Sequence, residues 1–194
     1  MRIAAVVLAA GRSERMGRPK PLLPCCGTTF LGTVLDTLKA SRVDDVRVVL
    51  GHRAEEIRVA LLLPEEIYVV NPRYDAGMLS SVQTGIRALP ADTAAFLLWP
   101  VDHPLVLADT VERIVEAFTS GGRGVVLPVH EGRRGHPVLF AARLAPALMA
   151  APESVGARAV ARAHAHEVLE LPVDDAGVVT DINTPEAYRE VFGL

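Results

Sequence analysis

Short apolar runs alternate with longer amphipathic segments through the first two thirds of the chain. The apolar runs have the length of β-strands and occupy residues 3–9, 46–50, 67–70 and 94–99. The amphipathic segments carry apolar side chains at the spacing of one helix face and occupy residues 28–40, 54–63, 79–89 and 107–118. Because the strands lack polar alternation and are separated by helices, the pattern predicts a mostly parallel sheet with helices on both faces.

The last third of the chain has a different pattern. Residues 124–129 and 136–140 are strand-like, and the polar stretch 131–135 predicts a hairpin between them. The further elements expected are helices at residues 141–150 and 157–165, a strand at 168–171 and a terminal helix after Thr184-Pro185. No linker or repeat interrupts the 194 residues, so we expect a single α/β domain with three α/β/α layers, a Rossmann-like sheet and a hairpin in its C-terminal half.

Composition and charge exclude several classes of protein. Half of the residues are hydrophobic and 22% are charged, which is typical of a globular protein. The formal net charge of -3 provides no basic excess for binding a nucleic acid, so we expect no nucleic-acid partner. The apolar run at residues 3–9 is too short to cross a bilayer and is soon followed by charged residues, so we expect a buried strand and no membrane partner.

The two cysteines of the chain, Cys25 and Cys26, are adjacent. A disulfide between sequence neighbours is strained and rare, so the pair does not indicate a secreted disulfide scaffold and fits a reducing cytoplasm. Two adjacent thiols can bind a soft metal, but no further cysteine is present to complete a site. This favours the simpler interpretation of two small residues in a loop.

The strongest candidate for a binding site is the segment that follows the first strand, residues 8–20. Ligands of open parallel sheets bind beyond the carboxyl ends of the strands, where this segment lies. Gly11 and Gly17 let backbone N–H groups approach phosphate oxygens, and positive charge comes from Arg12, Arg15, Arg18 and Lys20. The spacing is neither that of a Walker A loop nor Gly-x-Gly-x-x-Gly. The pattern therefore favours a phosphate-binding loop of another kind over a solvated basic turn.

This segment resembles the signature of the MobA-like nucleotidyltransferase superfamily, roughly Leu-Ala-Ala/Gly-Gly-x-Ser-x-Arg-Met-Gly-x-x-Lys. The matching positions are Leu8, Ala9, Ala10, Gly11, Ser13, Arg15, Met16, Gly17 and Lys20. Within the superfamily the chain is most similar to the molybdenum cofactor cytidylyltransferases (MocA-like), because Ala10 stands where the guanylyltransferase branch usually has glycine. The resemblance implies catalytic roles for Arg15 and Lys20. It also implies nucleotide binding, with CTP favoured, by Leu8, Ala9, Ala10, Gly11, Ser13 and Gly17.

Residues 77–85 resemble the Gly-Met/Leu-x-Ser-Ser-x-x-x-Gly segment of the same family. The resemblance implies that Gly77, Ser80 and Ser81 help to hold the nucleotide. The physical reason is a helix N-terminus whose free N–H groups and hydroxyls face a ligand. Ordinary capping of the helix by Ser80 explains the serines as an alternative.

Two aspartates are candidates for binding a metal ion. Asp102 follows a buried strand in a segment that resembles the family's Pro-x-Asp-x-Pro, and Asp181 lies in one that resembles its Asp-Ile-Asn/Asp-Thr-Pro-Glu ending. The resemblance implies that Asp102 and Asp181 hold the catalytic Mg2+, for which a carboxylate at the carboxyl edge of the sheet is suited. A turn or helix-start role is the alternative for each, and His103 is expected to be a turn histidine.

Residues 132–140 resemble a segment typical of the molybdopterin-specific branch. Arg134 and His136, beside Arg133, offer donors to a second anionic substrate. Asn183 is a further candidate for acceptor binding and a substitute for Asp181 as metal ligand. A solvated hairpin tip explains the arginines equally well but explains His136 less well.

The resemblance implies a Mg2+-dependent nucleotidyltransferase in which residues 1–105 bind the nucleotide and residues 106–194 bind the acceptor. The favoured reaction transfers CMP from CTP to the phosphate of molybdopterin and releases pyrophosphate. It implies a molybdoenzyme or a chaperone as recipient of the product. Guanylyl transfer and nucleotidyl transfer to a sugar phosphate are the nearest alternatives, and a nucleotide-binding regulator without catalysis is the alternative of another class.

Overall fold

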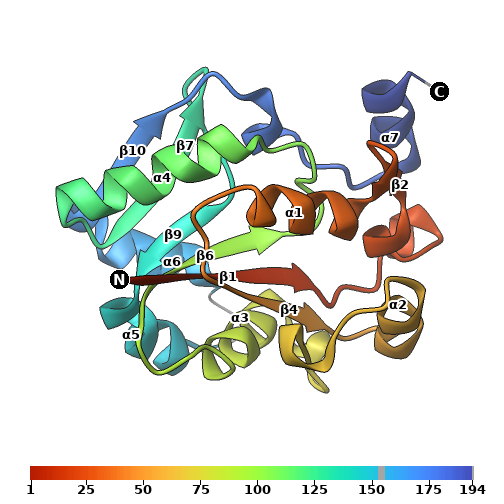
Figure 1. The fold of residues 1–194 in the computed structure, drawn as a ribbon, viewed down its shortest axis with the longest axis horizontal. Helices are drawn as coiled ribbons and strands as arrows, with labels where there is room; N and C mark the ends of the chain where they lie inside the picture. The colour runs from red at the N-terminus through yellow and green to blue at the C-terminus, as the bar shows by residue number, and fades with distance from the viewer. Residues whose placement is uncertain (153–155, 194) are drawn as a thin grey trace.

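The structure, a computed structural model, describes residues 1–152 and 156–193 and is built around one central β-sheet (Figure 1). Its strands lie in the order β10-β7-β9-β6-β1-β4-β5, and the short β8 pairs with β7. Their bounds are β1 Arg2–Ala9, β4 Asp45–Leu50, β5 Tyr68–Val70, β6 Thr93–Pro100, β7 Val125–His130, β8 Arg133–Arg134, β9 Val138–Ala141 and β10 Val168–Pro172. All pairings in this described sheet are parallel except those of β8 and β9, so the predicted mostly parallel α/β fold is confirmed.

Helices cover both faces of this sheet (Figure 1). One face carries α1 (Phe30–Lys39), α2 (Ala54–Ala60) and α4 (Ala108–Gly121). The other carries α3 (Met78–Arg87), α5 (Ala145–Ala150) and α6 (Ala157–Ala163). The last helix, α7 (Pro185–Phe192), packs Tyr188 and Phe192 beside the Phe30 ring at the start of α1. None of the described helices has the length and apolar character needed to cross a membrane.

The unbroken apolar run of β1 follows from this burial on both faces. Ile3, Ala5, Val7 and Ala9 contact the core on the α1 and α4 side. Ala4, Val6, Leu8 and Ala10 contact the core on the α3 side. Because successive strand side chains point to opposite faces, a strand with two buried faces has no position for a polar residue.

Several predicted elements differ from the structure in their bounds, and two of the differences have a clear physical reason. The helix expected at residues 28–40 begins only at Phe30, because Thr28–Thr29 (β3) pairs with Pro24–Cys25 (β2) in a small antiparallel sheet. Thr29 instead caps α1, and its hydroxyl accepts a hydrogen bond from Gly32 N at 3.1 Å. The predicted hairpin is present as β7 and β9. However, β9 also pairs with β6, so the hairpin lies inside the sheet and not at its edge.

The adjacent cysteines lie at the turn between β2 and β3. Cys25 is buried and Cys26 is exposed, and both are free thiols with their sulfur atoms 3.5 Å apart. Burial raises the pKa of Cys25 to about 11, which keeps this thiol protonated and unreactive at neutral pH. The expected loop therefore holds for Cys26, whereas Cys25 is the last residue of β2.

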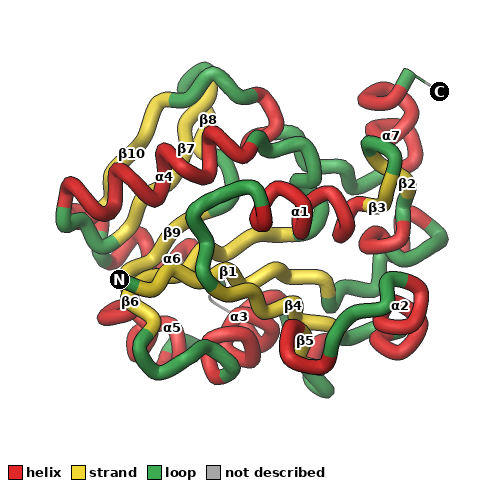
Figure 2. Tube along the Cα trace, viewed as in Figure 1, coloured by secondary structure: helices red, strands yellow, loops and turns green. Residues whose placement is uncertain are grey.

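The strands β1, β4 and β6 run in the same direction, so their carboxyl ends lie together at one end of the sheet (Figure 1). β1 lies between β4 and β6, so the chain leaves β1 toward one side and later returns to its other side. Such a reversal of strand order opens a crevice beyond the carboxyl ends of the strands, where α/β proteins bind ligands. The loops that follow these strands gather at this edge in Figure 2.

Candidate active site

The loop after β1 has a compact and locally fixed conformation. Its centre is a short 3-10 helix, Glu14–Met16, between Ser13 and Gly17, which have positive φ angles of 55° and 67°. The Ser13 hydroxyl accepts a hydrogen bond from the backbone N–H of Lys20 at 3.0 Å. The left-handed backbone at position 17 favours a glycine there. At Gly11, an added Cβ would meet no protein atom within 4 Å. The space above Gly11 is therefore open to a ligand.

A cavity of about 530 Å³ lies over this loop. Its lining brings together three separate parts of the chain: the loop itself, the segment before α3, and the segment before α7. The lining residues are Gly11, Arg12, Ser13, Glu14, Arg15, Lys20, Tyr74, Asp75 and Asn183. Tyr74 and Asp75 were not predicted as site residues, although the Asn-Pro turn after a strand is a signal for a loop at the carboxyl ends of the strands.

The positive groups of this cavity differ in their surroundings. Arg12 donates twice to Asp75, at 2.7 and 2.8 Å, and this bidentate contact holds the pKa of Asp75 below its usual value. Arg15 is exposed and has no ion-pair partner in the part of the chain that the structure describes. Arg18 is exposed and does not belong to the cavity lining. Arg15 is therefore the cavity arginine whose charge is not compensated by an ion pair among the described residues.

Lys20 lies at the centre of a polar cluster at the edge of the cavity. Its ammonium group donates to Asp102 Oδ2 at 3.2 Å and also to Asn183 Oδ1. Asn183 in turn donates from its Nδ2 to Asp181 Oδ2. The Lys20 and Asp102 side chains are only 14% and 21% exposed, which limits the screening of their ion pair by water. The structure therefore brings together the two aspartates, the lysine and the asparagine that were predicted from distant segments.

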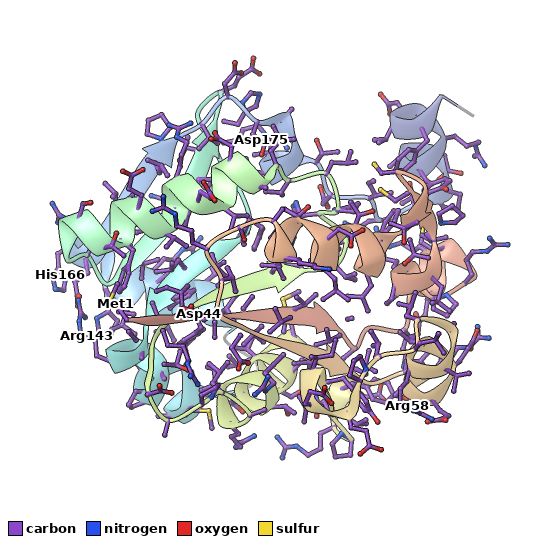
Figure 3. All side chains as sticks on the ribbon, in the orientation of Figure 1. Met1, Asp44, Arg58, Arg143, His166 and Asp175 are labelled. Carbon is purple, nitrogen blue, oxygen red and sulfur yellow. The ribbon has the colours of Figure 1, made fainter. Side chains whose placement is uncertain are left out.

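The segment that carries Asp181 is fixed by a buried carboxylate further upstream. Asp175, labelled beside α4 in Figure 3, accepts hydrogen bonds from Leu107 N at 3.0 Å, Thr110 Oγ1 at 2.7 Å and Gly177 N at 2.9 Å. Asp175 is 5% exposed, so these three donors compensate its desolvation. The contacts hold the chain between β10 and α7 against the start of α4, close to the loop after β6.

The serines at the start of α3 differ from the sequence-based expectation that their hydroxyls face a ligand. Ser80 and Ser81 are 3% and 5% exposed. Both accept from the Asn71 amide, at 2.9 and 3.0 Å, and Ser80 donates to the carbonyl oxygens of Arg73 and Gly77. Ser80 does not cap the helix, because Gly77 occupies the cap position. The two hydroxyls instead shape the loop that carries Tyr74 and Asp75.

The first residues of the signature occupy different places around the site. Leu8 contributes to a second cavity, whereas the side chains of Ala9 and Ala10 are buried in the cores on opposite faces of the sheet. The Ala10 carbonyl oxygen accepts from His52 N at 3.1 Å. A Cβ at Gly51 would lie 2.7 Å from this oxygen and 2.6 Å from Tyr74 Cβ. The absence of a side chain at Gly51 therefore permits the loops after β1 and β4 to approach each other.

The second cavity is larger, about 760 Å³, and opens on the α6 side of the sheet. Its lining is mainly apolar and includes Leu8, Met78, Leu98, Pro100, Val138 and Phe140. The polar residues of the lining include Arg134, His136, Arg158, Arg162 and Glu170. Leu8 and Pro100 lie at the carboxyl ends of β1 and β6, so this cavity begins beside the Lys20 cluster. Of the three predicted acceptor-binding residues, Arg134 and His136 line this cavity and Asn183 lines the smaller one.

Two histidines lie between the Lys20 cluster and this second cavity. The rings of His103 and His136 have their centroids 4.8 Å apart. Burial lowers the pKa of both imidazoles, and the neighbouring His103 lowers that of His136 further, to about 4. Both rings are therefore uncharged at neutral pH. His103 is 7% exposed and its Nδ1 has no hydrogen-bond partner among the described residues, so it is more buried than the turn histidine that was expected.

The donors of the Lys20 cluster fit a divalent cation. Asp102 and Asp181 offer carboxylate oxygens and Asn183 an amide oxygen, which are hard ligands of the type that Mg2+ and Mn2+ accept. The cationic Lys20 already lies between Asp102 and Asn183, so the electrostatic environment favours positive charge. No group of three or more His, Cys, Asp or Glu side chains suited to a metal occurs among residues 1–152 and 156–193. A cation here would therefore need water or phosphate oxygens as additional ligands.

Comparison with known proteins places the chain among the nucleotidyltransferases. Residues 5–168 match the profile of the MobA-like NTP transferase domain. The molybdenum cofactor cytidylyltransferase of Escherichia coli (strain K12) is 31% identical over 193 residues, which cover 96% of this chain and 93% of that protein. The nicotine blue oxidoreductase of Paenarthrobacter nicotinovorans is also 31% identical, over 96% of this chain and 95% of that protein.

Solved structures extend this similarity to the fold. The crystal structure of Rv0371c from Mycobacterium tuberculosis H37Rv superimposes with a TM-score of 0.87 and 29% sequence identity, covering 100% of this chain and 98% of that one. A complex of the same protein with manganese superimposes with a TM-score of 0.82 and 27% identity over 100% and 99% of the two chains. The profile match covers most of the chain and includes the glycine-containing loop, Lys20 and Asp102. The chain belongs to the MobA-like NTP transferase family of nucleotidyltransferases.

Proposed function

We propose that the protein transfers CMP from CTP to the phosphate of molybdopterin, in its free or molybdenum-bound form, and releases pyrophosphate. In this proposal residues 1–105 provide most of the nucleotide site and residues 106–194 most of the acceptor site. The larger cavity receives the acceptor, and a molybdoenzyme or a chaperone receives the product. The reducing cytoplasm is the proposed compartment, which the free thiols of Cys25 and Cys26 support.

The observation that carries the proposal is the position of the Lys20 ammonium between Asp102 and Asn183. This cluster lies at the carboxyl edge of the sheet, between a cavity lined by cations and a cavity lined by apolar groups. A nucleoside triphosphate and an acceptor phosphate are both anions, so their reaction requires cations at the place where they meet. The cluster provides that place.

Each part of the loop has a distinct proposed role. Backbone N–H groups around Gly11 and Gly17 donate to phosphate oxygens, and Arg15 and Lys20 bind the β- and γ-phosphates and stabilise the leaving pyrophosphate. Ser13 keeps Lys20 in place through its hydrogen bond to the Lys20 N–H. The catalytic effect therefore comes mainly from positioning and charge neutralisation.

The attacking group in this reaction needs no general base. An acceptor phosphate is already ionised at neutral pH, so no proton has to be removed before it attacks the α-phosphate. The uncharged His136 lines the larger cavity, and its proposed role is to hold the acceptor and not to remove a proton. His136 offers a ring N–H to the acceptor, and Arg134 offers a guanidinium already held by Glu170.

Asp102 and Asp181 would hold the divalent cation, with Asn183 as the neighbouring amide oxygen. Mg2+ is the cation that we propose, and the manganese complex of the Mycobacterium tuberculosis protein supports a divalent metal in this family. The bound cation would supply additional positive charge at the phosphates. Lys20 then orients the two ligand segments, since it contacts both Asp102 and Asn183.

The similarity to a molybdenum cofactor cytidylyltransferase along almost the whole chain supports CTP and molybdopterin as substrates. Ala10, which stands where the guanylyltransferase branch usually has glycine, supports the pyrimidine nucleotide. The decisive experiment measures pyrophosphate release with CTP and with GTP, each with molybdopterin, with a sugar phosphate, and without acceptor. We expect release only with CTP and molybdopterin.

The other outcomes of this assay identify the alternatives. Release with GTP and molybdopterin identifies a guanylyltransferase, and release with a sugar phosphate identifies that acceptor class. Binding of CTP in isothermal titration without pyrophosphate from any acceptor identifies a regulator and refutes the proposal. A Lys20→Gln variant serves as the negative control, because contaminating transferases would not respond to the substitution.

A further inference from the structure

Two arginines of α6 face the larger cavity. Arg158 and Arg162 are separated by four positions on this helix and both line the cavity wall. Residues at this spacing lie on the same face of a helix, so the two guanidinium groups belong to one patch. The sequence pattern does not distinguish either residue, because arginines on a helix of mixed composition are usually solvated.

The charges of these arginines are not compensated by the described parts of the protein. Arg134 of the same cavity pairs with Glu170, and the nearby Arg143 pairs with Glu167. Neither Arg158 nor Arg162 has an ion-pair partner among residues 1–152 and 156–193. The cavity lining contains three arginines and one glutamate, which leaves two positive charges in excess while His136 is neutral.

The patch lies across the cavity from the reacting groups. The wall near the Lys20 cluster is formed by Leu8 and Pro100, at the ends of β1 and β6. His136 also lines the cavity, and its ring contacts that of His103, which follows Asp102 in the chain. An acceptor whose phosphate reaches Asp102 would therefore extend past His136 toward α6.

The walls between these ends are apolar. They are formed mainly by Leu98, Leu127, Val138, Phe140, Ala161 and Val168. A volume of about 760 Å³ is in the range of cavities that hold a compact ring-containing molecule. The shape and chemistry therefore suit a molecule with an apolar ring body and a charged group at each end.

We propose that Arg158 and Arg162 bind a second anionic group of the acceptor, at the end remote from the phosphate that attacks the nucleotide. This inference rests on the proposed nucleotidyl transfer and specifies its acceptor class: a phosphate monoester with a ring body and a further oxyanion or comparable anionic group. Guanidinium groups match such groups through paired N–H donors. Acceptors without the second anion are poor substrates.

The first test compares the wild type with Arg158→Gln, Arg162→Gln and the double variant in steady-state transfer from CTP to molybdopterin. We expect the KM for the acceptor to rise at least tenfold in the double variant, while kcat and the KM for CTP stay within twofold. Arg42→Gln, a substitution of an exposed arginine outside both cavities, is the matched control. The acceptor KM of the wild type should increase with ionic strength, and that of the double variant should increase less.

The second test does not depend on the reaction. Binding of 8-anilinonaphthalene-1-sulfonate, an aromatic anion, is titrated by fluorescence in the same proteins, and uncharged Nile red reports on the cavity itself. We expect the dissociation constant of the anion to rise at least tenfold in the double variant and that of Nile red to stay unchanged. Equal affinity for the anion, or a parallel loss of both dyes, overturns the inference.

The two tests separate this inference from the proposed function. If the wild type transfers CMP and the double variant has an unchanged acceptor KM, the arginine assignment is wrong and the function stands. If the wild type transfers nothing to molybdopterin, the proposed function is wrong, and the titration with the two dyes alone decides whether Arg158 and Arg162 form an anion site.

Discussion

Ile182 donates its backbone N–H to the carbonyl oxygen of Asp102 at 2.9 Å, and this bond joins the segment before α7 to the end of β6. Asp181 and Asn183 flank Ile182, so this bond brings their backbone next to that of Asp102. Lys20 completes the cluster through its contacts with Asp102 and Asn183. One backbone bond thus aligns acidic groups from the two halves of the chain, and the predicted effects of substitutions follow from this alignment.

Removal of either member of the Lys20–Asp102 pair should abolish transfer. We expect Lys20→Gln and Asp102→Asn to lower kcat at least a hundredfold, because each removes a charged contact at the phosphates where negative charge develops. The measurement is initial pyrophosphate release at saturating CTP and acceptor. Asp92→Asn and Lys39→Gln, which change surface charges outside both cavities, should retain activity. Near-normal turnover by Lys20→Gln or Asp102→Asn would contradict the assigned site.

Removal of divalent cations should have the same effect in a reversible form. Dialysis against EDTA should eliminate turnover, and Mg2+ or Mn2+ should restore it, because the proposed ligands Asp102, Asp181 and Asn183 are hard oxygen donors. Asp181→Asn should raise the Mg2+ concentration required for half-maximal activity about tenfold or more, since it removes one anionic ligand. Full activity in EDTA would show that the reaction needs no metal.

A side chain at Gly51 should disturb the nucleotide site from outside it. The Cβ of Gly51→Ala would lie 2.7 Å from Ala10 O and 2.6 Å from Tyr74 Cβ, so the two loops must move apart. We expect a loss of unfolding free energy of about 1–3 kcal/mol and a weaker binding of CTP in calorimetric titration. Gly121→Ala in α4 is the matched control, because its Cβ meets no atom within 4 Å and alanine favours helix. Equal melting temperatures of the two variants would refute the predicted clash.

The buried His136 should make the folded state less stable in mild acid. Its pKa is lowered from 6.5 to about 4, mainly by burial, so between these values the unfolded chain binds a proton that the folded protein does not. The free energy of unfolding should therefore fall as the pH drops through this window and level off below it. The contribution of this group is on the order of 3 kcal/mol at most.

Urea unfolding at several pH values between 7.5 and 4 tests this prediction. His136→Gln should show a smaller loss of stability across the window than the wild type, while the exposed His166→Gln should retain the full loss. His103 also has a lowered pKa and contributes in the same direction, so part of the slope should persist in His136→Gln. Identical slopes in wild type and His136→Gln would show that folding does not lower the pKa of His136.

Much of the fold was predictable from the sequence because it depends on neighbouring residues. The apolar run of β1, the helical spacing of α1 and α4 and the Thr184-Pro185 start of α7 each reflect local constraints on burial or capping. The start of α1 was placed too early because Thr28–Thr29 pairs with Pro24–Cys25, and a strand of two residues carries no pattern of its own.

The site was predictable only in part. The loop between Ser13 and Lys20 closes on itself, so its motif appears in consecutive residues. The serines at the start of α3 looked like ligand-facing groups, but Asn71 occupies their hydroxyls from a neighbouring loop. The larger cavity was not predictable, since α6 and the ends of β1 and β6 come to line the same cavity only in the folded molecule.

By itself the sequence determined where strands and helices form, that the sheet is buried on both faces, and that a glycine-containing loop with Lys20 follows β1. These properties depend on hydrophobic periodicity and on backbone preferences, which act over a few residues. Only the tertiary structure decided that Lys20, Asp102 and Asn183 share one cluster and that Asn183, in the half expected to bind the acceptor, lines the loop cavity. The reason is that strand order and loop packing bring distant segments together, and no local pattern records which partners will meet.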